Sequence, residues 1–261
     1  LAGLGTDWAD IPDRHRSLSA TFDYSWGLLS PTDQQALAKL AIFPAHFGYD
    51  SAKAVTSVSV MTLSRLVGHG LVHHTAQGRY ELHPLIRQFA HEKLMVHQTV
   101  YADIVRVFIG HIAQFLARQY PILRSEAMLE ARYAIYDEID SIRAVCQLAL
   151  DHHHADMLQD GLHSMALFYD YQVWYAEAIA LFERFAYALP DSHLLSVRAK
   201  VYLARFYQRI GNYTEAERLL NVVDPHLKDY PYEMALAYLQ WASVKFSQNI
   251  DEAMQYAHKA Y

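Results

Sequence analysis

Apolar residues recur at spacings of three and four along most of this 261-residue chain. Leu18, Phe22, Trp26 and Leu29 show the pattern first, and such a period places side chains on one face of an α-helix. The same period continues through the first 95 residues, with interruptions at glycine and proline. It predicts helices over 18–29, 31–43, 49–55, 60–68 and 84–94.

Local signals mark where these helices begin. Ser30 is expected to cap a helix that opens with Pro31, and Asp33 is placed to complete a capping box. Ser59 is expected to cap the helix that follows it. Two short strands, 71–74 and 79–82, are predicted around Gln77-Gly78. This first part of the chain therefore combines several helices with one β-hairpin.

The chain from Tyr101 onward shows no strand signal and holds few glycines, so it is predicted to be helical. Three segments there share a pattern of small and aromatic residues, which indicates an internal repeat. They are Val173–Ala178, Gly211–Leu220 and Asn249–Ala253. Aligning their shared alanine places repeat starts near 159, 197 and 234. The spacing is typical of paired helices that stack side by side.

These motifs resemble a known family. The order Arg14–Leu18, Tyr24-Ser25-Trp26 and Tyr80–Ala90 resembles the winged-helix module of the signal-transduction ATPases with numerous domains (STAND), in particular the bacterial NB-ARC and SARP-type regulators. Gly211–Leu220 resembles the second helix of a tetratricopeptide repeat (TPR). The resemblance implies a mainly α chain with a winged helix at 1–95, a helical connector at 96–158 and TPR-like repeats at 159–261.

The resemblance also implies a regulatory function. In the family, the winged helix couples a nucleotide switch to a sensor. The chain is therefore expected to be the coupling and sensor part of a longer regulator of signalling or transcription, whose upstream nucleotide-binding domain would hold ADP or ATP. The repeats would bind a protein, a peptide or a small inducer. The sequence contains no phosphate loop of the form G-x-x-x-x-G-K-[S/T], so the chain is not expected to be an enzyme.

His83 is the residue with candidate chemistry in the first part. Leu82-His83-Pro84 aligns with a Met-His-Asp motif whose histidine contacts the phosphates of ADP in the NB-ARC branch, although only the histidine is kept. The resemblance therefore implies a nucleotide contact by His83 in the presence of the nucleotide-binding domain. The alternative is that His83 only caps the helix that Pro84 opens.

The first helix of each repeat is expected to line a concave surface that carries the partner-binding residues. In the predicted register that surface holds His163, Leu167, Asp170, Arg198, Val201, Arg205, Gln208, Tyr238 and Lys245. Partner binding is predicted at Arg198, Arg205, Gln208, Tyr238 and Lys245, because a local positive groove attracts an acidic peptide or anionic inducer. The alternative is that these cations are solvated or paired within the chain.

DNA binding by the winged helix, with the repeats as an oligomerisation arm, is the second function considered. The helix at 60–68 offers only Arg65 to read bases, and the hairpin offers Arg79. Net charge is −6. Residues 1–95 hold eight basic and eight acidic residues. A nucleic-acid binder usually shows a basic face, and nothing in this charge balance demands one. DNA is therefore not an expected partner.

Other candidate sites are excluded by their geometry. His152, His153 and His154 are adjacent and point in different directions, so no metal site is expected. Cys146 lies in an apolar helix and is predicted to be inert. No catalytic residue is predicted. No apolar run of about 18 residues is recognised and no secretory leader is visible, so the chain is expected to be cytoplasmic and not to span a membrane.

Overall fold

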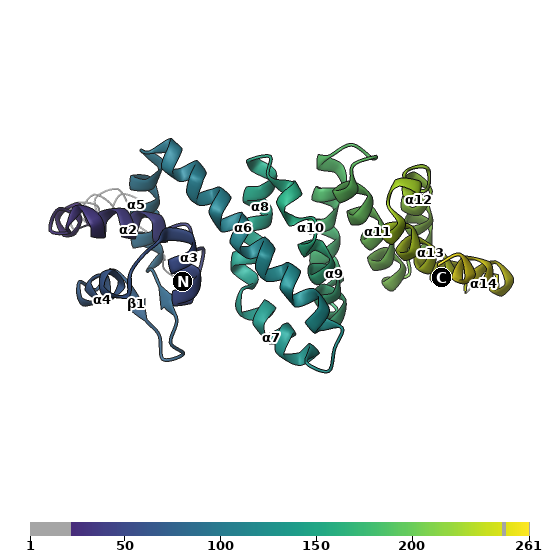
Figure 1. The fold of residues 1–261 in the computed structure, drawn as a ribbon, viewed down its shortest axis with the longest axis horizontal. Helices are drawn as coiled ribbons and strands as arrows, with labels where there is room; N and C mark the ends of the chain where they lie inside the picture. The colour runs from purple at the N-terminus through teal and green to yellow at the C-terminus, as the bar shows by residue number, and fades with distance from the viewer. Residues whose placement is uncertain (1–21, 247–248, 261) are drawn as a thin grey trace, which may run out of the picture. The chain divides into compact units, whose positions relative to one another are not determined.

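The computed structural model describes residues 22–246 and 249–260 (Figure 1). The motif Arg14–Leu18 lies outside these residues. The described chain is mainly α-helical with one two-stranded sheet, which confirms the predicted fold class. It divides into two compact units, Leu1–His111 and Ile112–Tyr261. The boundary falls inside helix α6, and the division at residues 95 and 158 stays a prediction.

The described part of the first unit contains three helices, a hairpin and a further helix in the predicted order, after a helical stretch over residues 22–27 and before the start of α6. These are α2 (Pro31–Leu40), α3 (Tyr49–Thr56), α4 (Val60–Gly68), β1 (His73–His74), β2 (Tyr80–Glu81) and α5 (Pro84–Met95). The strands are antiparallel, with His74 opposite Tyr80. Gly78 adopts a left-handed backbone with φ of 76° in the turn between them, a conformation that glycine adopts without strain.

Both predicted helix caps are present. The Ser30 hydroxyl accepts a hydrogen bond from the Asp33 amide at 3.2 Å, and the Ser59 hydroxyl accepts one from the Thr62 amide at 3.1 Å. The strands are shorter than predicted. The amides of Leu71 and Val72 donate to the Leu66 carbonyl at the end of α4, so these residues close the helix instead of extending β1.

The second unit is a series of packed helices that follow the last part of α6 (Gln98–Leu123). They are α7 (Met128–Asp137), α8 (Ile139–Asp151), α9 (Gly161–Gln172), α10 (Tyr175–Ala188), α11 (Leu194–Arg209), α12 (Tyr213–Val223), α13 (Pro231–Lys245) and α14 (Ile250–Lys259), with short 3-10 turns at Ala155–Leu158 and Asp224–Asp229. The first helices of three successive pairs begin at 161, 194 and 231, within three residues of the predicted repeat starts.

Helix α9 is buried on almost every side. Its residues Leu162, Met165, Ala166 and Phe168 are all at most 1% exposed. Gly161 lies close to α6, because a Cβ at this position would be 3.1 Å from the Leu116 Cβ. Ser164 donates from its hydroxyl to the Leu116 carbonyl at 2.5 Å. Small residues at this end of α9 therefore allow it to pack closely against the end of α6.

Helix α6 corrects one prediction. Among the described residues it is the one helix that is long and apolar enough to cross a membrane by length and composition, with a mean hydropathy of 1.4. The expectation that the chain holds no apolar run of about 18 residues is therefore wrong. Val105, Phe108 and Leu116 of this helix are buried in the core, and 39% of its apolar window is buried. The core helix of a globular protein passes the same test.

Candidate functional site

His83 is exposed at the start of α5. Its Nδ1 accepts a hydrogen bond from the Leu85 amide at 3.3 Å, and its backbone precedes Pro84 at the first turn. The residue therefore caps the helix, and the nucleotide contact stays a prediction. Because Nδ1 acts as the acceptor, the proton of the neutral ring lies on Nε2. An exposed Nε2–H is a donor suited to an anionic oxygen.

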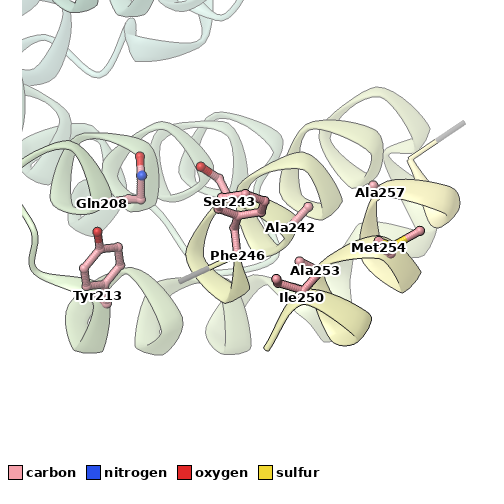
Figure 2. A pocket seen from close by; sticks show the side chains of 9 residues that line it. All are labelled: Gln208, Tyr213, Ala242, Ser243, Phe246, Ile250, Ala253, Met254 and Ala257. Atoms are coloured by element: carbon pink, nitrogen blue, oxygen red, sulfur yellow. The ribbon is translucent and has the colours of Figure 1, made fainter. Parts of the chain in front are cut away.

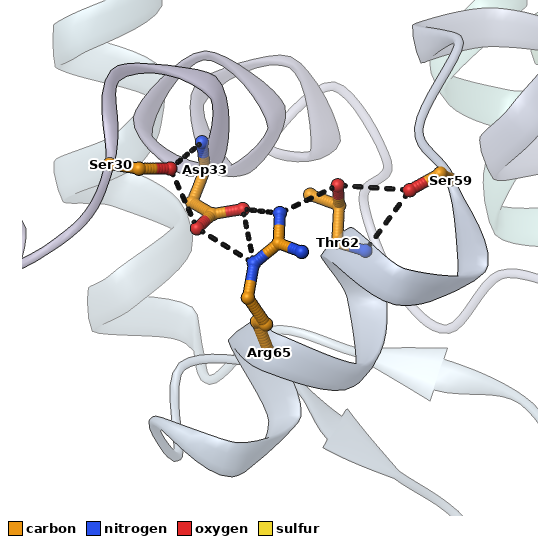
Figure 3. Close-up of polar contacts among 5 residues, drawn as sticks. All are labelled: Ser30, Asp33, Ser59, Thr62 and Arg65. Atoms are coloured by element: carbon orange, nitrogen blue, oxygen red, sulfur yellow. Dashed lines mark hydrogen bonds and ion pairs between the residues drawn. The ribbon is translucent and has the colours of Figure 1, made fainter.

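Arg65 is held in an ion pair inside the first unit (Figure 3). Its guanidinium Nη2 is 2.6 Å from Oδ1 of Asp33, and its Nε lies 3.1–3.2 Å from both carboxylate oxygens. The Ser30 hydroxyl donates to the same carboxylate at 2.8 Å. Asp33 is buried, and the Arg65 hydrogen bond holds the pKa of its carboxyl below the usual range.

The ion pair with Asp33 limits the donors that Arg65 could offer to DNA. Arg65 was the sole base-reading candidate on α4, and a guanidinium engaged by a carboxylate has few donors left for a base edge. The hairpin candidate Arg79 donates from Nη2 to the His46 carbonyl at 3.3 Å. The ion pair of Asp33 with Arg65 was not predicted, because the two residues lie 32 positions apart and Asp33 was expected only to cap α2.

Arg198 is buried between successive repeats. Its Nη2 is 2.6 Å from Oε1 of Glu233 in α13, and its Nη1 donates to the Gln159 carbonyl at 2.5 Å before α9. Asp160 lies 3.6 Å from the same Nη1. Arg198 and Glu233 are both buried. Burial costs both groups their hydration free energy, and the ion pair offsets this cost.

The other two predicted cations are also paired. Arg205 binds the buried carboxylate of Asp170 in α9, which Arg209 also contacts at 3.1 Å. Lys245 in α13 lies 2.9 Å from Glu217 in α12. The premise of an unpaired positive groove across Arg198, Arg205 and Lys245 is therefore wrong. The physical reason is that helices of neighbouring repeats pack closely enough for carboxylates of one helix to reach cations of another.

We call the pairs Arg198–Glu233, Arg205–Asp170 and Lys245–Glu217 the inter-repeat ion pairs. Each joins two different helices of the second unit. Partner binding at these residues stays a prediction, but their observed contacts are structural. Gln208 and Tyr238 complete the predicted set and are not members of these pairs. The Tyr238 ring is 6.2 Å from that of Tyr256 in α14.

Gln208 lines a shallow, mainly apolar groove of about 470 Å³ between the last repeats (Figure 2). Tyr213 lies beside it, and the α13–α14 side contributes Phe246, Ile250 and Met254. The groove also includes Ala242, Ser243, Ala253 and Ala257. The groove thus combines small residues such as Ala253 with the exposed apolar side chains of Phe246, Ile250 and Met254.

An aromatic cluster surrounds His163 on α9. Its Nδ1 lies 2.7 Å from the Tyr202 hydroxyl, and its ring packs 5.0 Å from the rings of Tyr120 and Tyr232. The hydroxyls of Tyr120 and Tyr232 contact each other. Burial, together with the nearby charges of Arg198 and Arg124, lowers the pKa of His163 to about 3. His163 is therefore neutral and serves as a hydrogen-bonding core residue.

The remaining candidates give no chemical centre within the described residues. No group of three histidine, cysteine or acidic side chains in this part of the chain could hold a metal ion. Cys146 is buried, and burial raises the pKa of its thiol to about 12, so the reactive thiolate is suppressed. The prediction that Cys146 is unreactive agrees with this environment.

Comparisons with known proteins give one structural relative. No protein-family model matches the chain, and no curated protein matches it. The chain is similar to the crystal structure of a STAND protein with a tetratricopeptide repeat sensor from Pyrococcus horikoshii. The two share 19% identity at a TM-score of 0.46, over 93% of this chain and 39% of the other. This chain thus spans well under half of the length of that protein.

Proposed function

We propose that the chain is the coupling and sensor region of a STAND-type regulator of signalling or transcription. The first unit would act as the winged helix that contacts an upstream nucleotide-binding domain. The second unit would bind an inducer or a protein partner. The support is the family-like motif order of the sequence together with a helix–hairpin–helix unit followed by paired helices.

One observation carries the coupling part of the proposal. Helix α6 contributes to the cores of both units. Its Phe108 packs against Phe43 of the first unit with ring centroids 5.1 Å apart, and its Leu116 accepts the Ser164 hydrogen bond in the second. A displacement of α6 by a ligand of the repeats would therefore act on the core of the first unit at Phe43.

The inter-repeat ion pairs give the sensor a two-state element. Each pair joins two helices of neighbouring repeats, and its charged groups are buried or partly buried. Such pairs either form with good geometry or leave a costly unpaired charge. A partner that separates two repeats would open a pair as a discrete event, which is the behaviour that a signalling switch requires.

His83 is proposed to be the contact to nucleotide in the longer protein. Capping of α5 uses Nδ1 and leaves the Nε2–H available. In that role the ring would donate to a phosphate oxygen of bound ADP and stabilise the closed state. The bound nucleotide would be supplied by the upstream domain.

A gel-shift experiment separates this proposal from a DNA-binding regulator. The purified chain is titrated against random duplex DNA at low and at moderate ionic strength. We expect no shift, because Arg65 is held by Asp33 and the first 95 residues carry no net charge. A shift that weakens steeply with salt, is lost in Arg65→Ala and persists in the exposed-arginine control Arg106→Ala would contradict the proposal.

A further inference from the structure

The outer side of α7 carries an exposed aromatic surface. Leu129, Tyr133 and Tyr136 are 56%, 72% and 51% exposed. Their spacing of four and three residues places them on one side of the helix. We call this surface, together with the exposed acidic residues Glu126, Glu130 and Asp137, the α7 face.

The core does not require this aromatic character. The opposite side of α7 buries Ala131 and Ile135, at 1% and 0% exposed, and these residues anchor the helix to the second unit. A surface helix normally places polar residues opposite such an apolar stripe. Exposed tyrosines are instead typical of protein interfaces, where they supply a large contact area at a small cost in conformational entropy.

The apolar surface continues onto the turn between α9 and α10. The rings of Tyr136 and Trp174 lie 6.1 Å apart. Val173, the preceding residue, is 65% exposed and adopts a left-handed backbone with φ of 60°. A β-branched residue in this region is strained, so an exposed valine here is unfavourable for the isolated chain on two grounds.

The charges of the α7 face are acidic. Among residues 22–246 and 249–260, Glu126, Glu130 and Asp137 take part in no ion pair. Arg132, the basic residue of α7, donates to Gln172 at 3.0 Å and lies 5.9 Å from the Tyr171 ring, so it is engaged away from this surface. The α7 face thus offers tyrosine rings and carboxylates side by side.

Next to the α7 face, Arg143 binds an aromatic ring and two carboxylates at the same time. The guanidinium of Arg143 lies 5.9 Å from the Trp174 ring centre, 2.7 Å from Glu177 and 3.2 Å from Asp140. An arginine can stack on an aromatic ring and pair with a carboxylate at the same time. On the α7 face the rings and carboxylates are present without the arginine.

We propose that the α7 face docks a basic, arginine-bearing segment of a protein partner. Arginines of the partner stack on Tyr133 and Tyr136 and pair with Glu126, Glu130 and Asp137, while apolar side chains of the partner cover Leu129 at one end of the face and Val173 at the other. The charge of the face repels nucleic acid and anionic membranes. This site lies outside the repeat residues to which the sequence analysis assigned partner binding.

The test uses a fluorescein-labelled amphipathic peptide of arginine and leucine, with a glutamate-for-arginine peptide as its counterpart. Fluorescence anisotropy is measured against the whole chain at two ionic strengths. We expect the arginine peptide to bind, the glutamate peptide not to bind, and salt to weaken the complex. Tyr133→Ala is expected to weaken binding about tenfold, as is typical of an aromatic interface residue. Glu130→Gln is expected to weaken it less.

Tyr24→Ala is the matched control, because Tyr24 is 71% exposed and lies in the first unit. Circular dichroism establishes that each variant keeps its helical content. Equal binding by wild type and Tyr133→Ala, or an equal loss in Tyr24→Ala, would overturn the proposal. A dimer in sedimentation that Tyr133→Ala dissociates would assign the α7 face to a second copy of the chain and would overturn it as well.

Discussion

Asp33 shows how a single residue can serve two structural roles. Its backbone amide is capped by Ser30 at the start of α2, and its carboxylate binds Arg65 on α4. Because the Arg65 hydrogen bond stabilises the ionised form, the pKa of Asp33 is lowered. The ion pair therefore joins two helices of the first unit at neutral pH.

Replacing Asp33 by asparagine keeps the shape and removes the charge. We expect Asp33→Asn to lower the free energy of unfolding by roughly 1 kcal/mol at neutral pH, since one side of the pair is solvent-exposed. Urea unfolding followed by circular dichroism measures this. The difference should shrink in acid, because a carboxyl with a lowered pKa loses its stabilising charge as pH falls through that pKa. The exposed pair variant Asp23→Asn is the control, and an equal effect there would contradict the prediction.

His163 is the second residue whose environment gives a pH prediction. Its folded pKa of about 3 lies below its usual value of 6.5. The unfolded chain therefore binds a proton at this residue between those values while the folded chain does not. The contribution of His163 to stability is complete above pH 6.5 and is lost progressively as pH falls toward 3.

A His163→Leu variant tests this sign. We expect the stability of the wild type to fall faster than that of the variant between pH 6.5 and pH 4.5, as measured by thermal unfolding at a series of pH values. His97, which is exposed, provides the comparison through His97→Leu. Parallel pH profiles for wild type and His163→Leu would mean that His163 has the same pKa in the folded and the unfolded chain, and would contradict the prediction.

At the scale of elements, the inter-repeat ion pairs determine how neighbouring repeats pack. The pair of Arg198 and Glu233 is buried on both sides, and Arg198 also satisfies the Gln159 carbonyl. If one partner is removed, the other remains as a buried charge with neither a counter-charge nor water to stabilise it. The unpaired charge then dominates the energetic cost.

Arg198→Ala is therefore expected to lower the free energy of unfolding by about 3–5 kcal/mol. The double variant Arg198→Met with Glu233→Gln should recover most of this loss, because it removes both charges. Urea midpoints of the three proteins measure the difference. A double variant as unstable as Arg198→Ala would mean that packing, and not the buried charge, accounts for the effect.

The sequence predicted much of the fold because its signals are local. Ser30 and Ser59 cap helices through residues three positions away, and the repeat period follows from alanine and aromatic spacing. The site was predicted less well. Arg205 and Asp170 lie 35 positions apart, so their pairing depends on how α9 and α11 pack and cannot be derived from spacing. A basic residue on a predicted inner face therefore indicates a charge without indicating whether that charge is free.

At the scale of the whole molecule, α6 is the element that the two units share. The boundary at His111 falls within this helix, and buried side chains lie on both sides of it. A continuous helix transmits a displacement along its axis better than a flexible linker does. The proposed coupling therefore depends on α6, and the proposed output depends on the nucleotide contact of His83.

The most direct measurement is the nucleotide content of the full-length protein that carries this chain, purified as wild type, His83→Ala and His97→Ala. His97 is the control because it lies just after α5, at the opposite end from His83. We predict that the wild type and His97→Ala retain ADP, and that His83→Ala loses it about tenfold more readily, as for removal of one charge-assisted hydrogen bond. Equal retention by all three proteins, or a wild type that binds no nucleotide, would contradict the account.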